Sequence, residues 1–342
     1  SRFREGDLLL LHGGSPLDQL LGRRWSLEAE EDDRWLLRGS SVAAVLDAYD
    51  GGDCYADPDT IDLAPYYERA LREIATSPIG RDVVLPLLGG RLDISFDDRD
   101  VEEGERTALA EGFNARQAEA VGLAFGAEQV ACIQGPPGTG KTRVLASIAR
   151  LLVQRGERVL LTSHTHMAIH NAANKIHALG VPVVKISRDT QRKGLDDAIA
   201  CCPSLGAWAQ RPSNGYVVGA TPFATCNARL EHCEFDTVIF DEASQVTVAL
   251  ALMAMRVGRR FVFIGDHKQL PPVVLSRSVL SGESPSVFAT LTSGQADHSV
   301  MLTATYRMNQ WLTDWPSRTH YGGQLAAAQA IRAYERALGE AL

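Results

Sequence analysis

The chain has 342 residues, of which 45% are apolar, and it carries a formal net charge of −8. A chain of this length and composition can bury a substantial core in each of two compact domains, which predicts an ordinary globular protein. No stretch approaches the roughly eighteen uninterrupted apolar residues of a membrane span, and the opening SRFREGDLLLL lacks the cleavage region of a signal peptide, so we expect a cytoplasmic protein without a membrane partner.

The charge is unevenly distributed along the chain. Residues 1–110 hold 12 Lys and Arg against 24 Asp and Glu, whereas residues 111–342 hold 22 against 18. A protein that binds a nucleic-acid strand needs only a locally positive groove. The overall acidity therefore argues only weakly against strand binding, and the small positive excess of the second part is no strong argument for it.

The first hundred or so residues have the pattern of a small β domain. Short alternating apolar runs such as DLLLLHG and DRWLLRGSSVAAVL are separated by Gly-Gly pairs, which predicts a small barrel. Residues 63–75 have helical spacing, and the acidic run at 97–105 is expected to be an exposed connection. We therefore predict an accessory domain over residues 1–108.

From residue 128 onward, strands, loops and helices alternate. Near-continuous apolar runs end at polar or glycine-rich corners, which favours strands that are buried on both faces of a parallel sheet. Ligands of such sheets bind beyond the carboxyl ends of the strands. The predicted fold class is α/β, with a parallel sheet flanked by helices over residues 109–325 and a C-terminal helix over 326–342. The expected strands are QVACIQ, RVLLT, VPVVKI, YVVGA, DTVIF and RFVFIG.

The segment GPPGTGKT follows the expected strand VACIQ and opens a helix, which is the context of a phosphate-binding loop. Its glycines let backbone N–H groups face the phosphates, Lys141 meets the β and γ oxygens, and the Thr142 hydroxyl binds Mg²⁺. Because a chance match occurs in about one in a hundred chains of this length, we reject a mere glycine turn. The predicted cofactors are ATP and Mg²⁺, bound by Gly135, Pro136, Pro137, Gly138, Thr139, Gly140, Lys141, Thr142 and Arg143.

Two further polar corners follow later strands. Asp241 and Glu242 end the run TVIF, where Asp241 is placed to hold Mg²⁺ and Glu242 to orient and deprotonate the attacking water. Adjacent acids are common on protein surfaces, but beside a phosphate-binding loop that alternative becomes weak. Gln269 in GDHKQLPP follows the next strand, and its amide could contact both the γ-phosphate and its water. A proline turn with incidental polar residues is the other interpretation of GDHKQLPP.

Taken in order, these segments resemble a superfamily 1 helicase of the 5'-to-3' branch, which includes the Okazaki-fragment nuclease-helicase and the nonsense-mediated decay helicase. The resemblance covers residues 112–325 and rests on GFNARQAEAV, GPPGTGKT, LLTSHTHMAIHNAANKI, VVGAT, DEASQ, GDHKQLPP and LTATYRMN. It implies a P-loop NTPase of RecA-like fold, present as its first lobe only. Residues 1–108 are similar to the accessory barrel and stalk of this family.

The resemblance also implies roles for individual residues. Gln117 would read the adenine edge, Tyr306 would stack near the base, and Arg307 would reach the γ-phosphate. Other residues would hydrogen-bond the phosphates of a single nucleic-acid strand, with DNA preferred over RNA; these are Ser163, Thr165 and Thr221. The implied catalytic set is Lys141, Asp241, Glu242, Gln269 and Arg307.

A zinc site is the alternative interpretation of the histidines. His164, His166 and His170 include one i,i+4 pair, but no convincing carboxylate or cysteine completes a set. The six cysteines show no paired CxxC spacing, which predicts reduced thiols rather than a zinc ribbon or a disulfide framework. Cys226, His232 and Cys233 are likewise expected to pack rather than to bind metal.

The implied function is an ATP-dependent helicase motor that couples hydrolysis to 5'-to-3' movement on a single strand. Such motors bind ATP between two lobes, so we expect the 342-residue chain alone to bind nucleotide weakly, hydrolyse slowly and fail to unwind. The alternative is a regulatory module whose binding to nucleic acid or protein is switched by ATP without translocation. A third interpretation, a small-molecule P-loop kinase, does not explain why GDHKQLPP is followed by YRMN.

Overall fold

The protein is described by a computed structural model, which covers residues 3, 8–12, 25–31, 34–39, 53–58, 63–187, 192–230, 232–272, 286–293, 297–329 and 331. The chain divides into two compact units, Ser1–Pro65 and Tyr66–Leu342. None of the described helices is both long and apolar enough to cross a membrane.

The first unit contains a four-stranded antiparallel sheet in the order β3-β2-β1-β4. Alternate side chains of two strands form its small core, in which Leu9, Leu11, Trp25 and Leu27 are buried. These strands correspond to the predicted small β domain. Their bounds are β1 (Leu8–His12), β2 (Trp25–Glu31), β3 (Arg34–Gly39) and β4 (Tyr55–Pro58).

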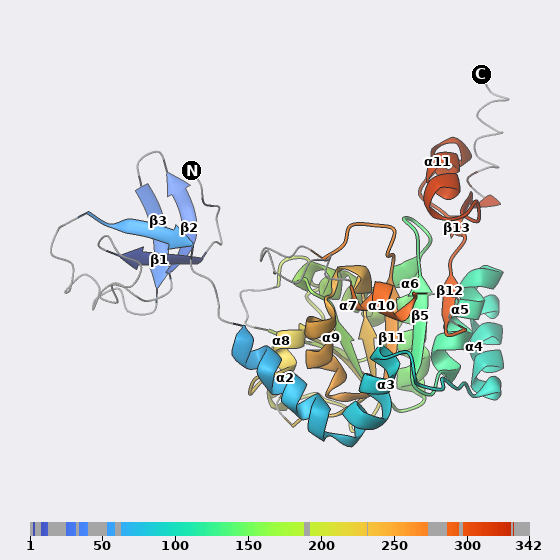
Figure 1. The fold of residues 1–342 in the computed structure, drawn as a ribbon, viewed down its shortest axis with the longest axis horizontal. Helices are drawn as coiled ribbons and strands as arrows, with labels where there is room; N and C mark the ends of the chain where they lie inside the picture. Colours follow the sequence, from blue (N-terminus) through green and yellow to red (C-terminus); the bar gives the residue numbers. More distant parts are fainter. Residues whose placement is uncertain are drawn as a thin grey trace. The chain divides into compact units, whose positions relative to one another are not determined.

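The second unit is built on an eight-stranded sheet in the order β12-β5-β11-β10-β6-β9-β7-β8, and every described strand pair in it is parallel (Figure 1). This confirms the predicted α/β sheet. The strands are β5 (Val130–Gln134), β6 (Arg158–Thr162), β7 (Val183–Ile186), β8 (Ala200–Cys202), β9 (Tyr216–Gly219), β10 (Phe235–Phe240), β11 (Gly258–Gly265) and β12 (Ser299–Met301).

Helices cover both faces of this sheet. Successive residues of a strand point to opposite faces, and in β5 Ala131 and Ile133 belong to one core cluster while Val130 and Cys132 belong to another. The first cluster includes side chains of α5 (Ala115–Gly126), α6 (Lys141–Gln154) and α7 (His166–His177). The second includes side chains of α2 (Ala64–Thr76), α3 (Leu85–Leu88), α8 (Pro222–Thr225), α9 (Val248–Met255) and α10 (Val287–Leu291). Both faces of the strands are therefore buried, as their apolar composition predicts.

The acidic run at 97–105 is not the expected exposed connection, because most of it forms the helix α4 (Asp98–Ala110). Asp97 caps this helix by accepting hydrogen bonds from the backbone N–H groups of Arg99 and Asp100. The helix packs on α5, and a Cβ atom at Gly104 would lie 2.9 Å from the Cα of Gly122. The acidic side chains thus cover the outer face of a packed helix.

The two compact units divide well before the predicted domain boundary at residue 108, which falls inside α4. The preceding helix α2 already belongs to the second unit, since Ala70 is buried against Cys226 and Met253. Residues 66–108, which the sequence assigned to the accessory domain, therefore pack with the P-loop lobe.

The end of the described chain also differs from the prediction of a helix over 326–342. After α11 (Gln310–His320), the strand β14 (Ala326–Ala327) pairs in parallel with β13 (Ala304–Thr305). Backbone hydrogen bonds from Ala326 to Thr303 and from Ala328 to Thr305 extend this pairing. Most of the remaining predicted helix lies outside the described residues.

Candidate functional site

Three of the predicted site segments follow strands that are neighbours in the sheet, in the order β5-β11-β10. The P-loop follows β5, GDHKQLPP overlaps the end of β11, and the acid pair follows β10. The backbone N–H of Gly135 donates to the carbonyl of Gly265 over 2.9 Å. A Cβ atom at Gly265 would lie 2.8 Å from the backbone nitrogen of Ser244, in the turn after the acid pair. GDHKQLPP therefore contacts both the P-loop and the turn after the acid pair.

The P-loop has the backbone conformation that its glycines allow. Gly138 and Gly140 adopt φ values of +76° and +87°, and α6 begins at Lys141. The ammonium of Lys141 donates to the carbonyl of Gly135 over 2.8 Å, and a Cβ atom at Gly135 would lie 2.1 Å from Lys141 Cγ. The lysine thus folds back over the loop, and Thr142 lies beside it in the first turn of α6.

Asp241 lies within electrostatic reach of Lys141, and Glu242 is its direct neighbour in the chain. Asp241 is 4% exposed, and burial together with the charge of Glu242 raises its pKa to about 7, although the ammonium of Lys141 opposes the rise. Glu242 has a φ of +50°, and its N–H donates to Asp241 Oδ1 over 3.0 Å. A buried carboxylate beside a second acid offers the hard oxygen atoms that Mg²⁺ prefers, and so does the hydroxyl of Thr142. These residues fit Mg²⁺.

Gln269 is held near the same β-strand ends by hydrogen bonds to Asp266. Its side-chain amide nitrogen donates to Asp266 Oδ2 over 2.8 Å, and its backbone N–H donates to the Asp266 carbonyl over 3.0 Å. The other carboxylate oxygen of Asp266 accepts from the side-chain amide of Gln134, the last residue of β5, over 3.2 Å. Gln269 therefore lies one strand from the P-loop, as its position in the sequence predicts.

Tyr306 and Arg307 lie against the P-loop although they are far from it in the sequence. The N–H of Tyr306 donates to the Gly138 carbonyl over 2.8 Å, and the hydroxyl of Thr305 donates to the Pro137 carbonyl over 2.9 Å. The Tyr306 hydroxyl accepts from the side-chain amide of Asn114 over 2.9 Å. This places Arg307 beside the loop that would hold the phosphates. Thr305 and Asn114 had not been singled out from the sequence.

Gln117 is buried rather than facing an open base site. Its exposed fraction is 1%, its amide nitrogen donates to the Thr139 carbonyl over 2.9 Å, and its amide oxygen accepts from the Asn114 N–H over 3.1 Å. Reading adenine, which stays a prediction, requires this buried amide to become accessible to a base. Arg143 places its guanidinium 4.1 Å from the ring centroid of Phe113, so Phe113 is a further neighbour that the sequence did not indicate.

The residues that were predicted to contact a nucleic-acid strand follow β6 and β9. These are the next two β-strands across the sheet after β10. Thr165 is exposed and caps α7, accepting from the Ala168 N–H over 3.2 Å. Thr221 is half-exposed and makes no side-chain capping bond to α8. Ser163 is fully buried, and its hydroxyl has no hydrogen-bond partner among the described residues. Thr165 and Thr221 are therefore accessible to a nucleic-acid strand. Ser163 is not accessible to one in this conformation.

The histidines near this surface are held neutral by their surroundings. Burial lowers the pKa of His166 to about 4, assisted by the charge of the fully buried Lys185, and burial also lowers the pKa of His164 and His170. Within the described ranges, no three His, Cys, Asp or Glu side chains are arranged to hold a metal ion.

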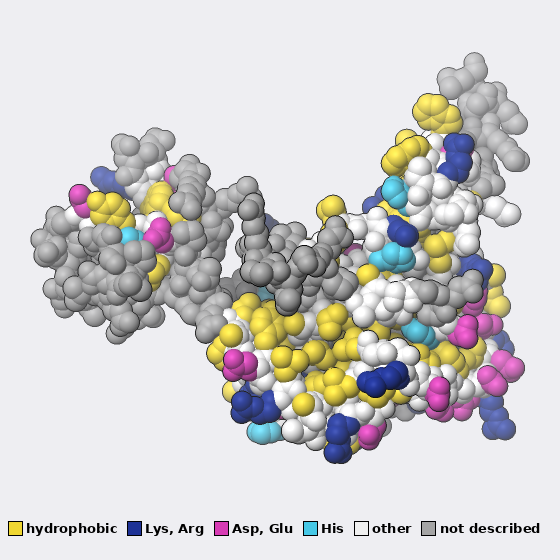
Figure 2. Space-filling model, in the orientation of Figure 1, with side chains coloured by type: hydrophobic (Ala, Val, Ile, Leu, Met, Phe, Trp, Pro, Cys, Tyr) yellow, Lys and Arg dark blue, Asp and Glu magenta, His cyan; other side chains and the backbone are white. Residues whose placement is uncertain are grey.

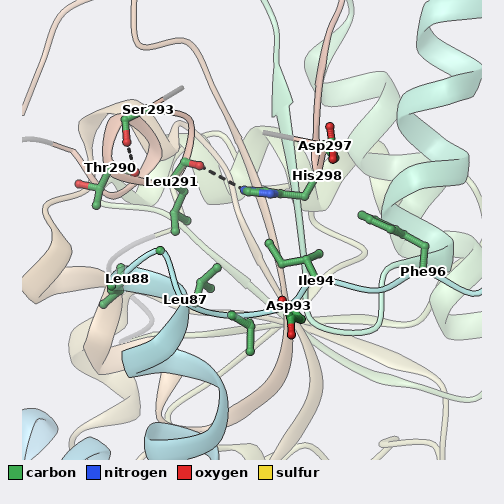
Figure 3. A pocket seen from close by; sticks show the side chains of 13 residues that line it. Leu87, Leu88, Asp93, Ile94, Phe96, Thr290, Leu291, Ser293, Asp297 and His298 are labelled. Atoms are coloured by element: carbon green, nitrogen blue, oxygen red, sulfur yellow. Dashed lines mark hydrogen bonds between the residues drawn. The ribbon is translucent and has the colours of Figure 1, made fainter. Parts of the chain in front are cut away.

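A cavity of about 580 Å³ lies away from all of these residues. Leu87, Leu88 and Ile94 line it together with the segment around α10, and His298 crosses it toward the Leu291 carbonyl, which its ring nitrogen approaches at 3.1 Å (Figure 3). None of its lining residues belongs to the P-loop, the acid pair or GDHKQLPP. Cavity volume therefore does not locate the candidate site, whereas the convergence of strand ends does.

Comparison with known proteins agrees with this geometry. Residues 112–337 match the family model described as AAA domain. The chain belongs to this AAA domain family. The match spans the P-loop, the acid pair, GDHKQLPP and Arg307.

Relatives of this AAA domain chain include helicases of DNA replication. The chain is 32% identical over 259 residues to the DNA replication ATP-dependent helicase/nuclease DNA2 of Saccharomyces cerevisiae, covering 72% of this chain and 17% of that protein. The Homo sapiens protein of the same name is 31% identical over 226 residues, covering 64% and 21%. The chain thus spans about a fifth of the length of these relatives.

A solved complex of arterivirus nonstructural protein 10, a helicase, with DNA overlaps 96% of this chain and 56% of that one, with a TM-score of 0.46 and 14% identity. A score below 0.5 supports no conclusion. The family match and the relatives confirm the resemblance to superfamily 1 helicases. The parallel sheet of this AAA domain has the RecA-like fold of a P-loop NTPase.

Proposed function

We propose that this chain is the ATP-hydrolysing lobe of a helicase that couples turnover of Mg-ATP to 5'-to-3' movement along single-stranded DNA. The observation that carries the proposal is the contact of GDHKQLPP, through Gly265, with both the P-loop and the turn after the acid pair. Strand ends that meet in this way can surround a single triphosphate. The direction of movement rests on the family resemblance, and the preference for DNA rests on the named role of the relatives in DNA replication.

In this mechanism each residue acts from the position described above. Lys141 neutralises the β and γ oxygens, while Thr142 and Asp241 hold the cation. Mg²⁺ supplies charge stabilisation for the phosphoryl group. Glu242 takes the proton of the attacking water, Gln269 orients that water, and Arg307 offsets charge that develops on the γ-phosphate. The other candidate nucleotide contacts are Gln117, Arg143 and Tyr306.

One backbone hydrogen bond connects the loop proposed to bind the nucleic-acid strand with the acid pair proposed to act in hydrolysis. The N–H of Asp241 donates to the carbonyl of Thr162 over 2.9 Å, and Thr162 lies three residues before Thr165, an exposed residue assigned to the nucleic-acid strand. A shift of this loop when a strand binds is transmitted to the acid pair through that hydrogen bond. This link supports coupling between strand binding and hydrolysis, and strand-stimulated turnover separates a motor from a module that is switched by ATP.

ATP turnover of the complete gene product tests the proposal when it is measured with single-stranded DNA, with single-stranded RNA and with neither. We expect DNA to stimulate turnover by tenfold or more, roughly the factor that a change of 1.4 kcal/mol in the barrier produces. Turnover that no strand stimulates would favour the alternative, a module switched by ATP. Equal stimulation by RNA would contradict the preference for DNA.

Residues 1–342 by themselves are expected to bind nucleotide weakly, to hydrolyse it slowly and not to unwind, because ATP in such motors is enclosed between two lobes that close on it. Unwinding of a 5'-tailed duplex by this chain alone would contradict that expectation.

A further inference from the structure

Asp266 is the centre of a buried hydrogen-bond network beside the proposed ATP site. Its exposed fraction is 1%. One carboxylate oxygen accepts from the side-chain amide of Gln134 and the N–H of Lys268, both over 3.2 Å. The other accepts from the side-chain amide of Gln269 over 2.8 Å and from the hydroxyl of Tyr321 over 2.7 Å. A buried carboxylate with four donors is held in one orientation.

The carboxylate fixes which end of the Gln269 amide faces the reaction. An ionised carboxylate only accepts hydrogen bonds, so the NH₂ group of Gln269, and not its oxygen, must point to Asp266. The amide oxygen then lies on the opposite side of the group. It is an acceptor, which suits it to hold a hydrogen of the attacking water.

Tyr321 reaches this network from a distant part of the chain. It follows α11, and 55 residues separate it from Asp266. Burial raises the pKa of Tyr321 and the neighbouring Asp266 raises it further, so the hydroxyl remains a donor at neutral pH. The residues before α11 are also tied to the site, because Thr305 and Tyr306 bond the P-loop carbonyls. Both ends of α11 are thus anchored at the nucleotide site.

We propose that Tyr321 is a positioning residue for ATP hydrolysis, whose hydroxyl holds Asp266 and thereby fixes the side-chain amide of Gln269. The inference rests on the proposed function and adds a dependence of turnover on the segment that carries α11. That helix exposes large apolar side chains, with Trp311 86% exposed and Trp315 65% exposed, and Figure 2 shows apolar side chains at its position.

The test removes only the hydroxyl, by Tyr321→Phe in the complete gene product, with DNA-stimulated ATP turnover as the measurement. We expect kcat to fall roughly tenfold, since loss of alignment of a reacting group has effects of this size or larger. The KM for ATP and the affinity for a fluorescent ADP analogue should change less than about twofold, because no P-loop contact is lost. Tyr66→Phe is the matched control, since Tyr66 lies on α2 and its hydroxyl has no hydrogen bond among the described residues.

A double-mutant cycle with Gln269→Ala separates positioning from general support of the fold. If Tyr321 acts through Gln269, Tyr321→Phe should lower turnover less than about twofold further in the Gln269→Ala background. A full tenfold further loss there would overturn the inference, and so would a Tyr321→Phe variant as active as Tyr66→Phe. Equal losses of kcat and ADP affinity would also overturn it, by showing a structural role. Absence of turnover in the unmodified protein would overturn the proposed function itself, before any substitution is compared.

Discussion

Gly138 lies directly against Arg307, so that a Cβ atom at Gly138 would stand 2.4 Å from the Cβ of Arg307. The same atom would lie 2.7 Å from the hydroxyl of Thr305. The glycine pattern of the P-loop therefore has two causes here. Gly138 needs a left-handed backbone, and it also leaves room for the segment that brings Arg307 to the loop.

Gly138→Ala is expected to abolish most ATP turnover and to lower stability, because the methyl group would push the Arg307 segment away. Gly180→Ala is a matched control, since Gly180 has the same φ of +76° and a Cβ atom there would meet nothing within 4 Å. Backbone strain alone should cost each variant about 1–2 kcal/mol of unfolding free energy. Thermal unfolding and turnover would be compared; equal turnover in the two variants would show that the contact with Arg307 is unimportant.

Asp241→Asn should stabilise the protein at pH 8 when Mg²⁺ and nucleotide are absent, while it abolishes Mg-dependent turnover. The folded pKa is about 7 and the ordinary value is 3.8, so between these values the folded state binds a proton that the unfolded state lacks. Stability of the unmodified protein therefore falls as pH rises through this window. The advantage of the Asn variant in thermal unfolding should be absent near pH 4, grow between pH 4 and pH 7, and stay constant above pH 7; a less stable variant at pH 8 would contradict this.

Lys185→Met is predicted to raise the unfolding free energy at pH 7. Lys185 is fully buried, and burial lowers its pKa from 10.5 to about 8, so the folded state must hold a buried charge below that pH. The pKa difference of about 2.5 corresponds to on the order of 3 kcal/mol. The cost of burying the charged lysine lowers the unfolding free energy fully below pH 8, and this cost disappears as the pH rises toward 10.5. Denaturant unfolding should show no such gain for Lys175→Met, which changes an exposed lysine.

Thr221→Ala should weaken the binding of a labelled single-stranded oligonucleotide by a factor of roughly three to ten, the value of one lost hydrogen bond. Nucleotide affinity should not change, because Thr221 follows β9 rather than a strand of the P-loop site. Ser163→Ala is expected to have no effect, since that hydroxyl is fully buried. Anisotropy at fixed salt measures both variants. If Ser163→Ala weakens oligonucleotide binding as much as Thr221→Ala does, the loop after β6 must open when the oligonucleotide binds.

Features that depend on local chemistry could be predicted from the sequence. Apolar runs long enough for buried strands indicated the parallel sheet, and the glycines and Lys141 located the phosphate loop. Because parallel strands end at one edge, the contact of GDHKQLPP with the P-loop and with the turn after the acid pair followed from the positions of these segments after strands.

Features that depend on tertiary packing could not be predicted in this way. The acidic run after Asp97 resembled a solvated connection, because the small side chains that let α4 pack on α5 leave no apolar stripe. Gln117 was expected at the base, but its burial and its bond to Thr139 depend on how α5 meets the P-loop. The bond between Tyr321 and Asp266 joins residues that no sequence spacing relates.

Binding and turnover of Mg-ATP by Glu242→Gln beside Lys141→Ala test the central claim most directly. If the lysine, the acid pair and the amide surround one triphosphate, turnover should be lost in both variants. Glu242→Gln should keep nucleotide affinity within about threefold, since only the base is removed, whereas Lys141→Ala should lose affinity with the charge that neutralises the phosphates. Normal turnover in either variant would contradict the account.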